Sequence, residues 1–163
     1  MTPRDSGRTA YYRAEQLVFT MFERAPSTRA VQLAGTELTL PVEARFASVQ
    51  SVREYVARVQ AMATVRERFR RAAVPVTVRP RRGNRKAHYA PAKAEIAIPD
   101  AAEGRWALRE LVVLHELAHH LDESEGPAHG PGFIETITTL VGLVLGPEAG
   151  FVYRVVLADS GVG

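Results

Sequence analysis

The segment His115-Glu116-Leu117-Ala118-His119 combines residue types and spacing that indicate metal chemistry. In a helix, residues four apart lie on the same face, so His115 and His119 can present imidazole nitrogens to a single ion. Glu116 is rotated by about 100° from that face. From there its carboxylate can reach a metal-bound water without binding the metal. The H-E-x-x-H pattern therefore predicts a zinc site with Glu116 as the general base.

The residues before this motif are apolar on nearly all sides, as Leu108 and the run 111–114 show. A helix that is apolar all round is a buried helix. Burying two imidazoles and a carboxylate requires compensation, which a metal ion and its water supply. The alternative is a core helix whose histidines bond to backbone carbonyls and whose glutamate pairs with an arginine.

A catalytic zinc takes three protein ligands and leaves the fourth position for water. The candidates for the third ligand follow the motif: Asp122, Glu123, Glu125, His129 and Glu135. The residues 126–128 break the helix and turn the chain back, so we expect His129 to be the ligand. Asp122 lies three residues after His119, and we expect it to bond a ligand histidine or cap the helix end. His120 points about 100° away from His119, so we expect a surface or packing residue. His88 belongs to no motif, so we expect it to be structural.

His115-Glu-Leu-Ala-His119 followed by His129-Gly-Pro-x-Phe133 resembles the SprT-like branch of the zincin metalloproteases. It also resembles small metallohydrolases of actinobacteria and their phages that are known chiefly from sequence. The metzincin pattern fits less well, because it needs glycine and histidine where this chain has Asp122 and Glu125. The similar part covers about residues 95–145.

The resemblance implies a zincin-like α+β fold, in which a small mixed sheet packs on the helix of the H-E-x-x-H motif with further helices around it. It implies zinc ligation by His115, His119 and His129, general-base catalysis by Glu116, and peptidase activity. In zincins the substrate lies along an edge strand, and residues 94–98 are the expected edge. A second electrophile often assists the reaction, and the candidates are Tyr89, Tyr153 and Arg154.

The chain has no cysteine, which excludes disulfides, thiolate nucleophiles and iron–sulfur clusters. It also lacks the cysteine zinc ribbon that SprT-like proteins often carry, so the resemblance implies nothing firm about DNA-linked substrates. Two other functions stay open from the sequence. One is a zinc hydrolase of non-peptide amides or esters. The other is a nucleic-acid- or partner-binding protein with a structural zinc.

Charge is distributed unevenly along the chain. Residues 1–98 carry 18 Lys and Arg against 8 Asp and Glu, whereas residues 99–163 carry 3 against 10. The densest basic stretch, 66–86, has nine basic residues and one acid. Such a stretch indicates either a nucleic-acid surface or a solvated helix followed by a basic turn. The candidate phosphate contacts are Arg79, Arg81, Arg82, Arg85 and Lys86.

The length of 163 residues predicts one domain, 1–163. Within it we expect N-terminal helices and a hairpin (1–72), a catalytic core (73–145) and a C-terminal helix (146–163). Periodicity and turn residues predict helices at 9–24, 48–72 (broken near Thr64), 103–121, 131–145 and 147–158, and strands at 31–33, 38–40, 76–78, 87–90 and 94–98. The polar N-terminus and the absence of 18 consecutive apolar residues predict a cytoplasmic protein.

Overall fold

The computed structural model describes residues 5, 7–28, 30–82, 86–99 and 107–159. Within these ranges the chain forms six α-helices and two small sheets, which confirms the predicted α+β class. The chain groups into two compact units, called unit 1 (1–43 and 123–163) and unit 2 (44–122), and each is described by itself. Over the same ranges, none of the helices is long and apolar enough to cross a membrane.

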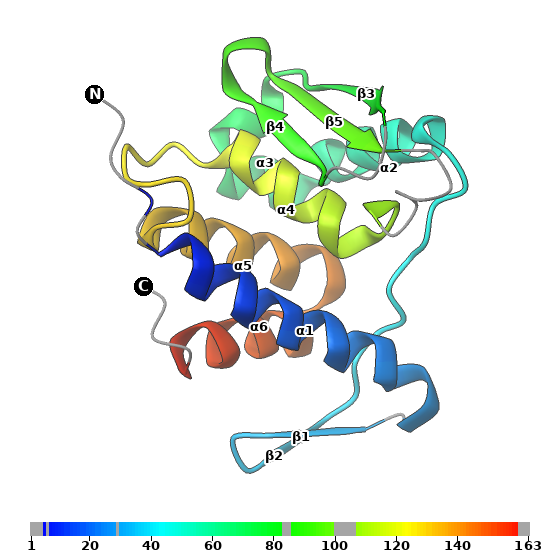
Figure 1. The fold of residues 1–163 in the computed structure, drawn as a ribbon, viewed down its shortest axis with the longest axis vertical. Helices are drawn as coiled ribbons and strands as arrows, with labels where there is room; N and C mark the ends of the chain where they lie inside the picture. Colours follow the sequence, from blue (N-terminus) through cyan, green and yellow to red (C-terminus); the bar gives the residue numbers. More distant parts are fainter. Residues whose placement is uncertain (1–4, 6, 29, 83–85, 100–106, 160–163) are drawn as a thin grey trace. The chain divides into compact units, whose positions relative to one another are not determined.

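Unit 1 is built on three helices, of which α1 and α5 both pack against α6 (Figure 1). Its elements are α1 (Arg8–Thr28), β1 (Val31–Leu33), β2 (Thr36–Leu38), α5 (Pro131–Leu145) and α6 (Pro147–Asp159). The predicted bounds of α5 are confirmed. The predicted end of α1 before Pro26 is wrong, since the helix continues to Thr28. A proline keeps a helix-compatible φ, and near a helix end it costs little more than one hydrogen bond.

Helices α5 and α6 approach closely through glycine. A Cβ added to Gly150 would lie 3.0 Å from the Cα of Gly142, so a side chain there would push the helices apart. Gly146 joins the two helices with φ of 104°, which glycine adopts without strain. The short connection therefore brings α6 back along α5 and buries Val141, Val152 and their neighbours between them.

The predicted hairpin is present, but its turn is tighter than expected. Ala34 and Gly35 both have positive φ, 50° and 77°, as a two-residue type I′ turn requires. Leu33 therefore pairs directly with Thr36, and β2 begins there rather than at Leu38. The sequence pattern predicts a four-residue turn, 34–37, because alternation alone does not show which residues adopt positive φ.

Unit 2 holds a three-stranded sheet and three helices. Its elements are α2 (Val49–Ala61), α3 (Ala63–Arg68), η1 (Arg70–Ala73), β3 (Thr77–Arg81), β4 (His88–Ala90), η2 (Pro91–Lys93), β5 (Glu95–Pro99) and α4 (Glu110–Leu121). Ser48 caps the start of α2, since its hydroxyl accepts a hydrogen bond from the Ser51 backbone N–H at 3.1 Å. The helical region breaks at Met62, two residues before the predicted position.

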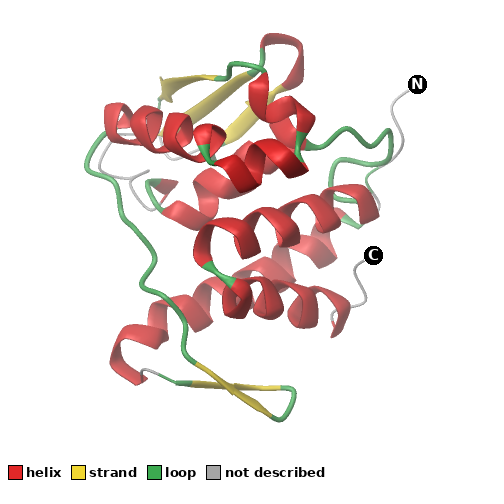
Figure 2. Cartoon of the chain, turned by 180° about the vertical axis from the view of Figure 1, so that it is seen from behind, coloured by secondary structure: helices red, strands yellow, loops and turns green. Residues whose placement is uncertain are grey.

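The strand order of this sheet is β3-β5-β4, so β5 is the central strand (Figure 2). Strand β4 pairs with β5 as the predicted antiparallel hairpin. On its other side β5 pairs in parallel with β3, with Val78 opposite Ile96. The prediction that residues 94–98 form a free edge is therefore wrong. The hairpin pattern in the sequence identified β4 as one neighbour of β5. The parallel partner β3 lies about 18 residues away in the chain, and no local sequence pattern indicates it.

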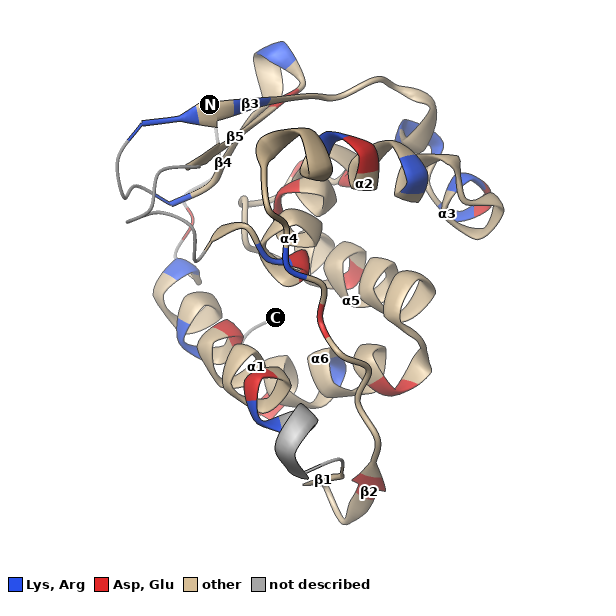
Figure 3. Ribbon diagram, turned by 90° about the vertical axis from the view of Figure 1, so that its right-hand side faces the viewer, with Lys and Arg blue, Asp and Glu red and all other residues tan. Residues whose placement is uncertain are grey.

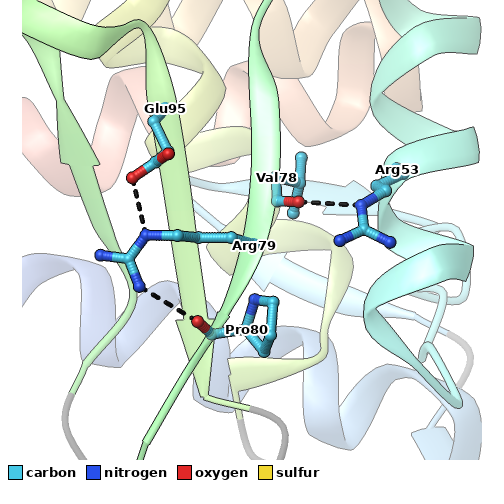
Figure 4. Close-up of polar contacts among 5 residues, drawn as sticks. All are labelled: Arg53, Val78, Arg79, Pro80 and Glu95. Carbon is cyan, nitrogen blue, oxygen red and sulfur yellow. Dashed lines mark hydrogen bonds and ion pairs between the residues drawn. The ribbon is translucent and has the colours of Figure 1, made fainter.

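The outer edge of β3 is closed to a further strand. The Nε of Arg53, on α2, donates to the Val78 carbonyl at 2.8 Å (Figure 4). Two residues along the strand, Pro80 has no N–H to offer, as is usual for proline at a sheet edge. The other edge strand is β4, which packs against α4. Strand β4 is consequently the edge of this sheet that lies beside the H-E-x-x-H helix.

Helix α4 begins at Glu110, later than the predicted start at residue 103. Part of the predicted first turns, 103–106, lies outside the described residues. The residues before α4 are extended instead, because Leu108 accepts a hydrogen bond from the Phe46 N–H at 2.9 Å and Glu110 donates to Ala44 at 3.0 Å. The Glu110 carboxylate also accepts bonds from the Ala44 N–H, at 2.9 Å, and from the Tyr55 hydroxyl. These contacts hold the start of the motif helix in unit 2.

Candidate metal centre

His115 and His119 lie one turn apart on α4, as the motif predicts. Their Nε2 atoms are 3.2 Å apart and their rings are tilted by 70° to each other. His115 is 3% exposed, whereas His119 is half-buried. Two ligands at 2.0–2.1 Å from a tetrahedral zinc are separated by about 3.3–3.4 Å. The observed distance between the two Nε2 atoms therefore suits two nitrogens that share one ion. A hydrogen bond from one neutral imidazole to the other would have a similar donor–acceptor distance.

His129 lies in unit 1, on the turn before α5, and is 6% exposed. Its Nδ1 is 2.7 Å from the Oδ2 atom of Asp5, and its backbone N–H donates to Oδ1 of the same carboxylate at 3.3 Å. The turn itself is tight, because Gly130 donates to the Pro127 carbonyl at 3.0 Å. Since Nδ1 is directed at a carboxylate, Nε2 is the ring nitrogen that would bind a metal ion.

Aromatic rings surround His129 within unit 1. The ring centroids of Tyr11, Tyr12 and Phe133 lie 5.1, 5.1 and 5.2 Å from that of the imidazole. Tyr11 is fully buried and donates to the Glu15 carboxylate at 3.1 Å. Burial, with a smaller contribution from Glu15, raises the pKa of the Tyr11 hydroxyl well above its usual value. Tyr11 thus stays a neutral donor, and the packed rings restrict how His129 can turn.

His115, His119 and His129 each offer a ligand atom, and these atoms lie within 4.8 Å of one another. The three residues are therefore close enough to hold a metal ion. The donor set is three imidazoles, which is the set of several catalytic zinc sites. A zinc ion held by these three residues would keep a fourth position for water or substrate.

The described carboxylates that competed for the third position do not join this group. The side chain of Glu135 is largely exposed and lies 3.9 Å from Nη1 of Arg154. It also accepts a hydrogen bond from Thr139, one turn further along α5, at 3.3 Å. Asp122 caps the end of α4, where its N–H donates to the Ala118 carbonyl at 2.9 Å. A carboxylate ligand from the following helix is thus not favoured by the geometry.

Glu116 is 6% exposed and directly follows His115 on α4. Its place in the helix puts it about 100° away from the histidine face, as expected of a residue that does not bind the metal. A buried carboxylate needs polar partners or an ion nearby. Its position on the helix is compatible with proton transfer beside the histidine pair.

Of the two expected alternatives for His120, the structure shows the packing residue, because its side chain is fully buried in the core of unit 2. Its Nε2 is 2.9 Å from the Val74 carbonyl and its Nδ1 is 2.8 Å from the Tyr89 hydroxyl. Nε2 therefore carries the proton and Nδ1 accepts one from tyrosine. Burial lowers the pKa of His120 and favours this neutral form. The Nε of Arg71 donates to the His120 carbonyl at 2.6 Å and satisfies the end of α4.

Replacing Tyr89 with phenylalanine should lower the free energy of unfolding by about 1–3 kcal/mol, because it removes the donor to a buried ring nitrogen. Equilibrium unfolding in urea measures this loss. His88→Ala, an exposed change on the same strand, is the matched control and should cost about 0.5 kcal/mol or less. An unchanged midpoint for Tyr89→Phe would contradict the structural importance of this bond.

Three side chains were candidates for the second electrophile. The hydroxyl of Tyr89 is engaged with His120 in unit 2. Tyr153 lies in unit 1 with 1% of its surface exposed, and the exposed Arg154 is directed at Glu135. The role of an oxyanion-stabilising residue therefore stays a sequence-based prediction.

Asp5 was missed by the sequence analysis. It is 124 residues away from His129 in the chain, and it belongs to no motif. Its residue type is common before a helix, where it is usually read as a cap. No spacing rule connects it with a turn that follows the motif helix.

Unit 2 carries most of the positive charge, with basic residues on β3, α2 and α3 (Figure 3). The predicted phosphate contacts are only partly available: Arg79 is 2.6 Å from the Glu95 carboxylate, and Nη1 of Arg81 donates to the Lys86 carbonyl at 2.6 Å. Arg85 lies outside the described residues. The other two side chains of the predicted set, Arg82 and Lys86, are exposed. Nucleic-acid binding stays a prediction from the sequence.

Comparisons with protein-family models, with curated proteins and with solved structures find no match for this chain.

Proposed function

We propose that this protein is a zinc-dependent metallohydrolase that cleaves peptide bonds. The observation that carries the proposal is the close approach of three imidazoles, two of them on a helix that also carries Glu116. The similarity of segments 115–119 and 129–133 to SprT-like zincins supports a peptide substrate and a zincin-like arrangement of this α+β fold. The absence of any carboxylate among the three ligands supports zinc over harder cations such as magnesium and calcium.

A zinc ion held by these histidines would polarise the scissile carbonyl and lower the pKa of water to about 7. Glu116 takes the proton of the attacking water and transfers it to the leaving amine. His115 and His119 hold fixed positions because α4 is anchored at both ends, through Glu110 at its start and Arg71 at its end. Fixed ligands are needed for catalysis because a displacement of about 1 Å can cost 10²-fold in rate.

We propose that the substrate binds in an extended form along β4. This strand is an edge of its sheet and packs against α4, and its first residue, His88, is exposed. Strand addition provides main-chain hydrogen bonds without demanding a particular sequence. On the opposite side of the sheet, Arg53 already donates a hydrogen bond to the Val78 carbonyl of β3. This favours β4 as the edge that binds the substrate.

The direct test is to digest a mixed peptide library with the purified, zinc-loaded chain and to assay a panel of small amides and esters in parallel. We expect peptide cleavage that a chelator abolishes and added zinc restores. Turnover of the small amides without peptide cleavage would replace the peptidase with another zinc hydrolase. Bound zinc without turnover in either assay would contradict the enzymatic proposal and favour a structural zinc.

A further inference from the structure

The carboxylate of Asp5 makes two contacts with one residue, His129. Oδ2 lies 2.7 Å from the ring Nδ1, and Oδ1 accepts the backbone N–H at 3.3 Å. The shorter distance is that of a charge-assisted hydrogen bond. Both groups belong to unit 1, and the ring end of the pair is the more buried, with side-chain exposures of 7% for His129 and 21% for Asp5.

Asp5 is not acting simply as a helix cap. Its backbone carbonyl starts the first turn, where it accepts the Arg8 N–H at 3.4 Å. Its side chain is directed instead at His129, whereas a capping aspartate would bond the N–H groups of the first turn. The N-terminal segment also packs on the same turn, because a Cβ on Gly7 would be 3.7 Å from the His129 carbonyl. The start of the chain is thus built against the candidate third ligand.

We propose that Asp5 is a positioning residue, which keeps the proton of His129 on Nδ1 and leaves the lone pair of Nε2 for the metal. This inference depends on the metal site of the proposed function. Metal-binding histidines commonly donate their second ring N–H to a carboxylate, which fixes the tautomer and makes the ligand nitrogen more basic. The rings of Tyr11, Tyr12 and Phe133 restrict the plane of the imidazole, and Asp5 selects which nitrogen carries the proton.

The first measurement is zinc affinity by competition with a chromophoric chelator. Asp5→Ala should weaken zinc binding by about 10–100-fold, the range for partners of metal ligands. Asp5→Asn retains an oxygen that can accept the Nδ1 proton, so its loss should be smaller. Asp159→Asn, an exposed carboxylate of the same unit, is the control and should not change affinity. In a His129→Ala background, Asp5→Ala should cost nothing further, because the ring that it positions is absent.

The second measurement uses the metal-free protein, so it does not depend on the proposed function. Long-range ¹H–¹⁵N spectra at about pH 8, where unperturbed imidazoles are neutral, should show the His129 proton on Nδ1 in the wild type. In Asp5→Ala we expect the proton to be shared between the two nitrogens. An unchanged tautomer together with unchanged zinc affinity would overturn the role of Asp5. Absence of zinc binding in the wild type would refute the metal site, while the tautomer would still test the contact.

Discussion

Replacing Glu116 with glutamine should leave zinc binding and the fold intact and lower turnover by about 10²–10⁴-fold, the usual contribution of general acid–base catalysis. Glutamine has the size of glutamate and keeps its oxygen, but it cannot accept and return a proton near neutral pH. Glu116 is 6% exposed, so the substitution also removes a buried charge without leaving a cavity. The measurements are kcat on a peptide from the library digest and the zinc content of the purified variant.

Glu110→Gln is the matched control for this experiment. It makes the same chemical change on the same helix at a residue that is also 6% exposed. The Glu110 carboxylate accepts hydrogen bonds from the Ala44 N–H and the Tyr55 hydroxyl. The Glu110→Gln variant should therefore lose stability and keep its turnover per folded molecule. Normal turnover in Glu116→Gln would contradict general-base catalysis and favour a zinc that is only structural.

His129→Ala should lower zinc affinity well beyond the 10–100-fold that is typical when a partner of a metal ligand is removed. Only two imidazoles would remain, and a two-ligand zinc is labile because catalytic sites need three protein ligands. Isothermal titration or chelator competition measures the change. Nδ1 of His129 is in close contact with Asp5, so Nε2 is the nitrogen that would bind zinc. His129→Ala removes this nitrogen.

Glu135→Ala and Asp122→Ala are the controls, and both should retain zinc. Glu135 is directed at Arg154 and Thr139, and Asp122 closes the end of α4. If Glu135→Ala emptied the site and His129→Ala did not, the third ligand would be a carboxylate from α5. The resemblance to SprT-like zincins would then be misleading, and a thermolysin-like set of two histidines and a glutamate would replace it.

Sequence by itself determined the features that depend on local spacing. The interval of four residues placed His115 and His119 on one face of a helix, and the structure has their Nε2 atoms 3.2 Å apart. Periodicity and turn residues predicted a helix at 131–145, and these bounds of α5 are confirmed. Helix periodicity and capping act over a few residues, so a single chain is enough to reveal them.

The tertiary structure decided the features that join distant segments. Strand β5 is central because β3 pairs with it in parallel, and α4 starts at Glu110 because residues 44–46 pair with the extended residues before it. The contact of Asp5 with His129 spans 124 residues, and that of Tyr89 with His120 spans 31. Each of these contacts depends on how packed elements approach in space. Neither residue type nor periodicity encodes that approach locally, because the free energy that selects it comes from burial and hydrogen bonding over the whole unit.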